Sequence, residues 1–175
     1  SPDTRTQVAS NLLQNYGYFR GHVDYTLVDQ KNPKKQKIAY DITLGKPYLY
    51  DSIEYKFKGT QDSLIQATLK ESEIKRGKQF STLGLTEEKD RIASLFHNNG
   101  FYYFRPDYIL YFADSIQNPY QLDMRIVPDI DMPEKAMQQY YFGDVSAYIR
   151  KSATRSLNQR SNSNRQSQRR DSLQG

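Results

Sequence analysis

The chain has 175 residues, enough for one medium-sized domain or two small ones with a buried core. It contains no cysteine, which excludes disulfides, thiolate metal sites and thiol nucleophiles. The mean hydropathy is −0.87, and no apolar run approaches the roughly 20 residues of a membrane-spanning helix. The first residues also lack the pattern of a secretory signal, so we expect a mature or excised fragment.

The net charge of +5 comes from the C-terminal end. Residues 151–175 carry six Lys or Arg residues and one Asp, which leaves 19 basic and 19 acidic residues in the rest of the chain. Ser, Asn, Gln and Arg dominate this end, and such a composition cannot bury enough apolar surface to offset its ordering entropy. We therefore predict a disordered basic tail at 151–175 and a formally neutral folded part.

The first 46 residues predict a helix followed by a β-hairpin. Residues 1–3 read Ser-Pro-Asp, a typical helix opening with a capping hydroxyl, a proline and an acid in the first turn. Gly17 is expected to end the helix in the left-handed conformation. Alternating apolar residues at 23–27 and 38–44 then predict two strands, separated by a charged loop at 29–35.

The next part of the chain predicts the order strand, helix, helix, strand, strand. Apolar alternation favours a strand at 53–57, and helical periodicity follows from Thr60 until it frays near 75–77. A second helix should begin at Ser81 or Thr82 and end at Gly100. An aromatic, β-prone run up to Phe112 and an alternating run at 120–126 predict the last two strands.

Parts of the chain repeat at a constant spacing. Gly17 and Gly100 lie 83 residues apart, as do Asp24 and Asp107, and the segment around Val145 resembles that around Ile53 at a spacing of 92 residues. We therefore predict repeated units: the C-terminal helix and hairpin of one unit at 1–46, a complete unit at 47–130, and a linker with the first strand of a following unit at 131–150.

The β-α-α-β-β order resembles that of the polypeptide-transport-associated (POTRA) domain. The resemblance includes a Gly-x-x-Phe element between the helices, Gly77 and Phe80, and an Asn-Gly-Phe-Tyr run at 99–102 that enters the hairpin. It implies an α+β fold in which a small mixed three-stranded sheet carries two helices on one face, with such units in tandem. It also implies a periplasmic location within an outer-membrane protein of the BamA/TamA-like family, attached to an outer-membrane β-barrel. The high tyrosine content is similar to that of Bacteroidetes-type outer-membrane proteins.

In function, the resemblance implies a non-enzymatic, chaperone-like scaffold that binds unfolded outer-membrane polypeptides and assembly-complex subunits. Binding would occur by β-augmentation, because an edge strand has unpaired main-chain groups that can bind another strand. In the family this edge is the strand after the second helix. The corresponding residues here are Arg105, Asp107, Tyr108, Ile109, Leu110, Tyr111 and Phe112. Which alternate residues of that strand face a bound polypeptide is not determined by the sequence.

Two segments between the predicted units are expected to act as hinges. The first is Gly45-Lys46-Pro47 and the second runs from Asp129 to Pro133. Glycine and proline favour turns over regular structure, so these segments would set the angle between successive units.

No residue pattern indicates catalysis, a cofactor or a metal. The sequence has neither a nucleophile elbow nor a glycine-rich phosphate loop. His22 and His97 are isolated from other ligand types at metal-site spacings. Asp129 and Asp131 lie beside prolines, which favours a solvated linker over a calcium site or an acid/base pair.

Two alternatives remain open at this stage. The aromatic run Phe101–Phe104 beside a basic tail also fits an RNA-binding domain that stacks bases on its sheet, although the folded part is neutral. The same POTRA-like fold would also suit a partner-docking domain of a division or two-partner secretion protein.

If the strand around Leu110 binds clients at its edge, Leu110→Pro is expected to remove binding while the helices persist. Circular dichroism and a peptide titration would check this expectation.

Overall fold

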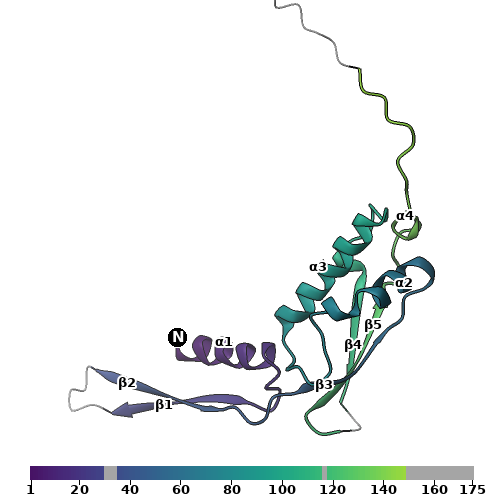
Figure 1. Ribbon diagram of the computed structural model, residues 1–175. Coiled ribbons are helices and arrows are strands. Elements are labelled where there is room, and N and C mark those ends of the chain that lie inside the picture. The colour runs from purple at the N-terminus through teal and green to yellow at the C-terminus, as the bar shows by residue number, and fades with distance from the viewer. Residues whose placement is uncertain (30–34, 116–117, 149–175) are drawn as a thin grey trace, which may run out of the picture. The chain divides into compact units, whose positions relative to one another are not determined.

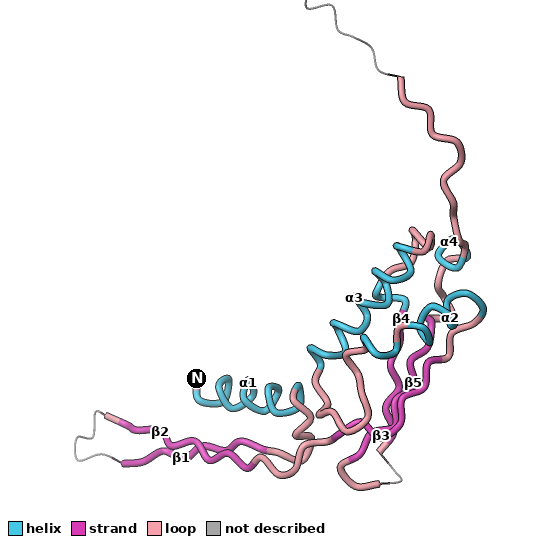
Figure 2. Tube along the Cα trace, in the orientation of Figure 1, coloured by secondary structure: helices cyan, strands magenta, loops and turns pink. Residues whose placement is uncertain are grey.

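The computed structural model describes residues 1–29, 35–115 and 118–148. The chain divides into two compact units, residues 1–141 and 142–175. In the second unit the described residues, 142–148, form neither helix nor strand and are drawn as loop in Figure 2. The predicted tail at 151–175 lies outside the described residues. No described helix is long and apolar enough to cross a membrane.

A three-stranded mixed sheet forms the centre of residues 49–128, and two helices cover one of its faces (Figure 1). The spatial order of the strands is β3-β5-β4, with β3 parallel and β4 antiparallel to the central β5. The elements are, in chain order, β3 (Leu49–Tyr55), α2 (Gly59–Ala67), α3 (Thr82–Asn98), β4 (Ile109–Asp114) and β5 (Gln121–Pro128). This arrangement confirms the predicted α+β, β-α-α-β-β fold class.

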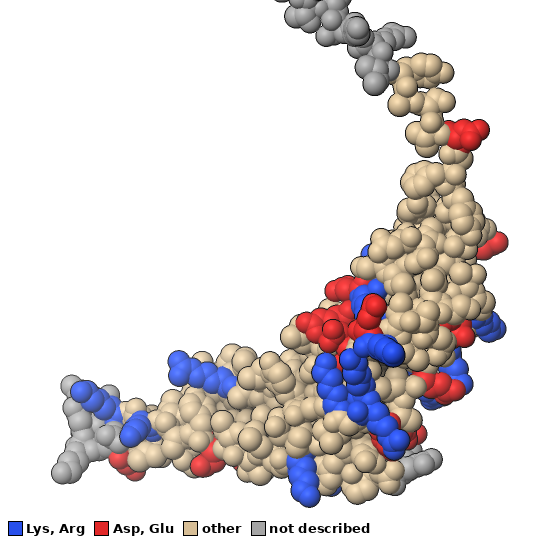
Figure 3. Space-filling model, viewed as in Figure 1, with Lys and Arg blue, Asp and Glu red and all other residues tan. Residues whose placement is uncertain are grey.

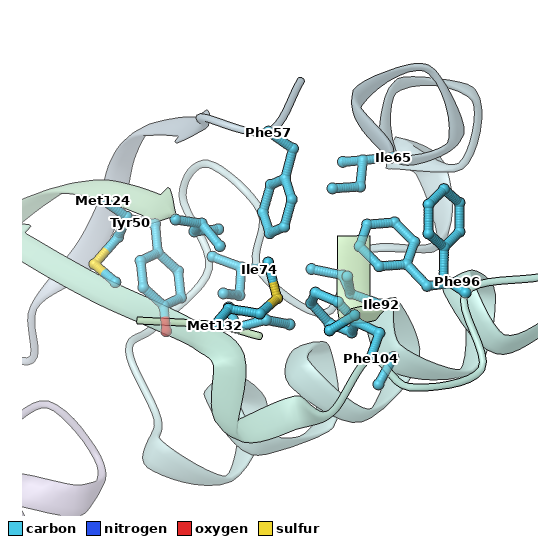
Figure 4. Close-up of a cluster of buried hydrophobic side chains, with 14 of the residues drawn as sticks. Tyr50, Phe57, Ile65, Ile74, Ile92, Phe96, Phe104, Met124 and Met132 are labelled. Carbon is cyan, nitrogen blue, oxygen red and sulfur yellow. The ribbon is translucent and has the colours of Figure 1, made fainter. Parts of the chain in front are cut away.

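The core lies between the sheet and the two helices (Figure 4). Ile65 of α2, Ile92 and Phe96 of α3, and Ile126 of β5 are completely buried. Aromatic rings fill much of the space, and the Phe96 ring lies edge-on to the Phe104 ring with centroids 4.7 Å apart. Each such side chain contributes about 1.5–3 kcal/mol on burial, so this cluster stabilises the contact between the layers.

The N-terminal residues form the predicted helix and hairpin. These are α1 (Pro2–Asn15), β1 (His22–Asp29) and β2 (Gln36–Thr43), with the two strands antiparallel. Ser1 caps α1 by accepting a hydrogen bond from the Thr4 main chain, as its sequence predicts. The Tyr25 hydroxyl donates a 2.7 Å hydrogen bond to Asp3 and links β1 to α1. No residue of α1 is buried, however, and Val8 is 63% exposed.

Several predicted boundaries differ from the structure, and β3 covers Leu49–Tyr55 where a strand at 53–57 was expected. The first helix of the complete unit ends at Ala67 and continues as the 3₁₀ turn η1 (Leu69–Glu71) instead of reaching residue 75. Strand β4 begins at Ile109 and not at Arg105. Pro106 starts a second 3₁₀ turn, η2 (Pro106–Tyr108), because the fixed φ of proline suits a first helical position. The strand expected at 141–149 is not formed over 141–148, since an apolar alternating segment becomes a strand only by pairing with another.

A buried ion pair fastens the loop after η1 to α3. The completely buried Glu88 carboxylate accepts hydrogen bonds from Arg91 at 2.7 and 2.9 Å, from the Tyr55 hydroxyl at 2.7 Å and from the Glu73 main chain at 2.9 Å. Burial by itself would raise the pKa of Glu88, but the hydrogen bonds from Arg91, Tyr55 and Glu73 outweigh it and lower the pKa. Glu88 is therefore ionised and satisfied in the folded protein.

Glu88→Gln should lower the free energy of unfolding by about 3 kcal/mol at pH 7, because it leaves Arg91 without its charged partner. A folded-state pKa below the unfolded value means that the stabilisation is complete above the unfolded pKa of about 4.3 and is lost as the pH falls through the folded-state pKa. Urea unfolding should show the difference between wild type and variant shrinking below that pH. The exposed neighbour Glu87→Gln is the matched control, and an equal effect of both variants would contradict the assignment.

Candidate polypeptide-binding site

The two edges of the three-stranded sheet differ in what covers them. Along β3, the segment that contains the Gly-x-x-Phe element pairs with Tyr48 and Tyr50. The main-chain bonds are Tyr50 N–H to Lys78 O at 2.9 Å, Gly77 N–H to Tyr50 O at 2.7 Å and Phe80 N–H to Tyr48 O at 2.9 Å. Along β4, the described part of the chain provides no such cover. The chain thus closes part of one edge and leaves the other open.

The register of the β4–β5 ladder shows which main-chain groups of β4 point away from the sheet. Asp129 donates to the Tyr108 carbonyl at 2.7 Å, and Ile109 lies opposite Pro128, which has no N–H to give. Because hydrogen-bonded and non-bonded pairs alternate in an antiparallel ladder, Leu110 bonds to β5 and Tyr111 does not. The main-chain groups of β4 that remain open are therefore the carbonyl of Ile109 and both the N–H and the carbonyl of Tyr111 and Ala113. The Ile109 N–H is not among them, because it donates to the Pro106 carbonyl.

Side chains alternate across β4 in the same way. Ile109 is completely buried against the helices, and the Tyr111 hydroxyl donates a 2.8 Å hydrogen bond to the Leu85 carbonyl on α3. Leu110 and Phe112 therefore lie on the opposite face of the sheet, where Phe112 is 50% exposed and the Arg125 guanidinium lies 5.9 Å from its ring centre. The alternation that the sequence left open is thereby defined: Leu110 and Phe112 are the apolar side chains on the open face.

The edge formed by β4 lacks the features that usually protect exposed edges. Its sequence is Ile-Leu-Tyr-Phe-Ala-Asp, without lysine, proline or bulge, and its one charge, Asp114, lies at the end. An unprotected apolar edge readily pairs with another extended chain. Geometrically, this edge of the three-stranded sheet can accept another extended chain.

The first three predicted site residues lie before the strand. Arg105 forms a 3.0 Å ion pair with Asp107, and its guanidinium lies 6.0 Å from the ring centre of Tyr108. Both ion-pair side chains are exposed, so the pair contributes at most about 1 kcal/mol. Arg105, Asp107 and Tyr108 form the turn that leads into β4 and are not part of its open edge.

The two helix-stop glycines have the expected geometry. Gly17 has φ +80° and Gly100 has φ +90°, both in the left-handed region. Each comes directly after the C-cap residue of its helix, and the chain then leads into a hairpin.

The predicted hinge residues lie in different surroundings. Gly45 has φ +70° with open space around it, and the Lys46 ammonium lies 5.9 Å from the Tyr120 ring centre, whereas Pro47 simply precedes the buried Tyr48. The second segment packs on the complete unit. Asp129 donates to the Tyr108 carbonyl, Met132 is buried, and Pro133 caps the short helix α4 (Glu134–Met137), whose Ala136 is completely buried.

An open cavity of about 360 Å³ lies beside the Glu88 network, with Tyr55 and Ser72 among its lining residues. Both hydroxyls are already used, because they hydrogen-bond to each other at 3.0 Å and to Glu88 or the Ile74 carbonyl. The described residues contain no cluster of His, Asp and Glu suited to a metal ion. The sequence analysis did not predict this network. The one sign of it in the sequence is Glu88, a glutamate on the otherwise apolar face of α3.

The structure removes the basis of the RNA-binding alternative within the described residues. The run Phe101–Phe104 is not a strand, and Phe101 and Phe104 are buried in the core, so neither ring can stack on a base. Basic and acidic side chains also lie next to one another on the face drawn in Figure 3. A nucleic-acid site needs a clustered basic surface beside exposed rings.

Comparisons with known proteins give a distant structural similarity only. No protein-family model and no curated protein matches the chain. Solved structures that resemble it include BamA from Haemophilus ducreyi lacking POTRA domains 1–3 and POTRA domains 3–5 of Haemophilus influenzae BamA. Each aligns at 15% identity and a TM-score of 0.44 over 73% of this chain, but over 22% and 49% of the respective structures. The chain therefore spans less than half of each structure.

The ladder register changes the residue at which proline tests the edge. Ala113→Pro removes an N–H that points away from β5 and should change the free energy of unfolding by less than about 1 kcal/mol. Leu110→Pro removes a ladder hydrogen bond and should cost about 3 kcal/mol or more, so loss of binding in that variant would not by itself identify the edge. Denaturant unfolding checks both, and equal destabilisation by the two prolines would contradict the register.

Proposed function

We propose that this chain is a non-enzymatic scaffold module that binds extended polypeptides by β-augmentation along β4. A client strand would bond to the carbonyl of Ile109 and to the main chain of Tyr111 and Ala113. Its alternate side chains would lie beside Leu110 and Phe112 on the open face. Main-chain bonds make up most of this contact, so the site would accept many sequences that can extend.

The observation that carries the proposal is the asymmetry of the sheet edges. Part of the β3 edge is covered by three main-chain hydrogen bonds from the chain itself, whereas β4 exposes apolar residues without a lysine or proline among them. An exposed edge of this kind promotes aggregation, so we expect a protein to keep it only where the edge binds a ligand.

We further propose that residues 1–46 and 47–130 are successive units of one tandem array. The helix and hairpin α1-β1-β2 have the order of α3-β4-β5, and Tyr25 bonds to the first turn of α1 as Tyr111 bonds to that of α3. The N-terminal unit lacks counterparts of β3 and α2 among these residues, and its helix buries nothing. A preceding strand and helix would pair with β2 and cover the exposed Val8 and Leu12.

In line with the POTRA resemblance, we infer that such an array lies in the periplasm, as part of an outer-membrane assembly or translocation factor, with unfolded outer-membrane polypeptides and assembly subunits as ligands. A partner-docking role in a division or two-partner secretion protein uses the same edge with one fixed ligand. The two roles differ in selectivity, because a chaperone-like edge binds many alternating apolar peptides with similar affinity.

An NMR titration of the isotope-labelled chain with a synthetic peptide of alternating apolar and polar residues tests the proposal. We expect shifts at the Tyr111 and Ala113 amides, and about tenfold weaker binding to Ala113→Pro, since losing one main-chain hydrogen bond costs on the order of 1 kcal/mol and the proline ring adds a steric cost.

Ala113→Val keeps the N–H and is the matched control, so it should bind as wild type does. Equal affinity of the proline and valine variants would overturn the edge assignment. Titration with single-stranded RNA provides the contrast: shifts at exposed rings and in residues 151–175 with RNA, and none with peptide, would favour the RNA-binding alternative.

A further inference from the structure

Two tyrosines bind the two helix-stop glycines in the same way. The Tyr48 N–H donates to the Gly17 carbonyl at 2.9 Å, and the Tyr140 N–H donates to the Gly100 carbonyl at 2.8 Å. Each tyrosine follows a closing hairpin, β1–β2 or β4–β5, and the two lie 92 residues apart, the same spacing as Ile53 and Val145. In both places the chain thus returns from a hairpin to the end of the helix that preceded it.

Both sites also require glycine for space. A Cβ atom at Gly17 would lie 3.1 Å from the Cβ of Phe80, and one at Gly100 would lie 2.5 Å from the Tyr140 carbonyl oxygen. A glutamine satisfies the preceding carbonyl in each case: Gln79 bonds to Tyr16 O at 2.7 Å and Gln139 bonds to Asn99 O at 2.7 Å. A main-chain bond to the glycine carbonyl and a glutamine bond to the carbonyl before it therefore occur at both sites.

The two sites differ in one respect. At Gly17, the Gly-x-x-Phe element of the complete unit inserts Phe80, which is 8% exposed and lies 5.0 Å from the Phe19 ring centre. Phe19 also lies edge-on to Tyr48, with centroids 5.1 Å apart. An aromatic residue of the following unit thus completes this first junction.

At Gly100 the same edge-on contact exists between Tyr103 and Tyr140, with centroids 5.4 Å apart. However, none of the described atoms nearest to Gly100 is aromatic, and Tyr103 is 49% exposed, with the Lys135 ammonium 5.1 Å from its ring centre. The Gln139 side chain lies there instead, with its Cγ 3.1 Å from where a Gly100 Cβ would be. The second junction thus has the edge-on aromatic pair of the first but lacks the additional ring that Phe80 supplies there.

We propose that Gly100, Tyr103 and Tyr140 form a socket for a following β-α-α-β-β unit, which inserts an aromatic side chain equivalent to Phe80. The inference rests on the tandem arrangement proposed above. Residues 149–175 contain no aromatic residue and therefore do not supply this side chain. Docking moves the Gln139 side chain aside and buries the ring of Tyr103, as Phe19 is covered at the first junction.

A tandem variant tests the socket: the chain through Tyr140 joined directly to a second copy that begins at Leu49 and ends at Gly175. The second copy then presents its own Phe80 to Gly100 and Tyr103. We expect nuclear Overhauser contacts between that Phe80 ring and Tyr103, and equal rotational correlation times for the two copies. Tyr103→Ala, or Phe80→Ala in the second copy alone, should remove the contacts and let the copies tumble independently.

Gln139→Ala is the matched control and should leave the coupling unchanged, because its side chain is displaced on docking. A folded second copy that tumbles independently without any change at Gly100 would overturn the proposal. If the second copy does not fold, a capped peptide of residues 77–81 is added to the full chain. Shifts at the Gly100 and Tyr140 amides that are absent with an alanine in place of Phe80 then support the socket, and identical spectra with both peptides overturn it.

The β4 titration is run on the same variants and separates the two proposals. Loss of peptide binding in Ala113→Pro without contact at Tyr103 would leave the edge function standing and remove the socket. The opposite result would establish the junction without the edge function.

Discussion

The left-handed turn at each helix-stop glycine is the constraint on which the rest of this structure depends. At Gly17 and Gly100 a positive φ reverses the chain just past the helix, so the following strand can run back under it. Any side chain at these positions would be strained by the backbone and would collide with a neighbouring segment. The same turn leaves the glycine carbonyl available to Tyr48 or Tyr140, so one residue shapes the unit and also fixes where the next segment starts.

The core and the edges of the sheet have different roles in the rest of the structure. Aromatic and aliphatic side chains of α2, α3 and β5 fill the space under the helices and supply most of the favourable free energy. Because helix α2 is short, the loop that follows it and η1 needs its own anchor. Glu88 provides this anchor through its hydrogen bonds with Arg91 and with the Glu73 main chain. That loop leads to Gly77 and Phe80, which close part of the β3 edge, so a buried charge indirectly decides which edge stays open.

The sequence predicted the features that depend on local rules. Capping by Ser1 and Ser81, the glycine stops and the strand alternation all follow from short-range geometry, and the structure has each of them. The mixed sheet was an implication of the POTRA resemblance, and the structure has it. The beginning of β4 was predicted too early, because Pro106 begins a 3₁₀ turn that an aromatic, β-prone run does not reveal.

Features that depend on partners distant in sequence could not be predicted in this way. The faces of β4 depend on its register against Pro128 and Asp129, and one step of register exchanges Leu110 and Tyr111. The role of Glu88 depends on Tyr55 and on the Glu73 main chain, which meet it only in the folded chain. The cover on the β3 edge likewise forms between residues that carry no pairing signal of their own.

The repeated glycine sites give the most informative comparison, because the chain contains a completed junction and an incomplete one. Where Phe80 is present, its ring lies beside that of Phe19, and the carbonyl of Tyr16 is satisfied by Gln79. At the second junction Gln139 satisfies the equivalent carbonyl, but a glutamine stem cannot replace a ring against Tyr103. The carbonyl before each glycine is thus satisfied at both junctions, whereas Tyr103 remains half exposed. Hydrogen bonds fix the path of the chain within a unit, and the burial of rings favours the addition of the next.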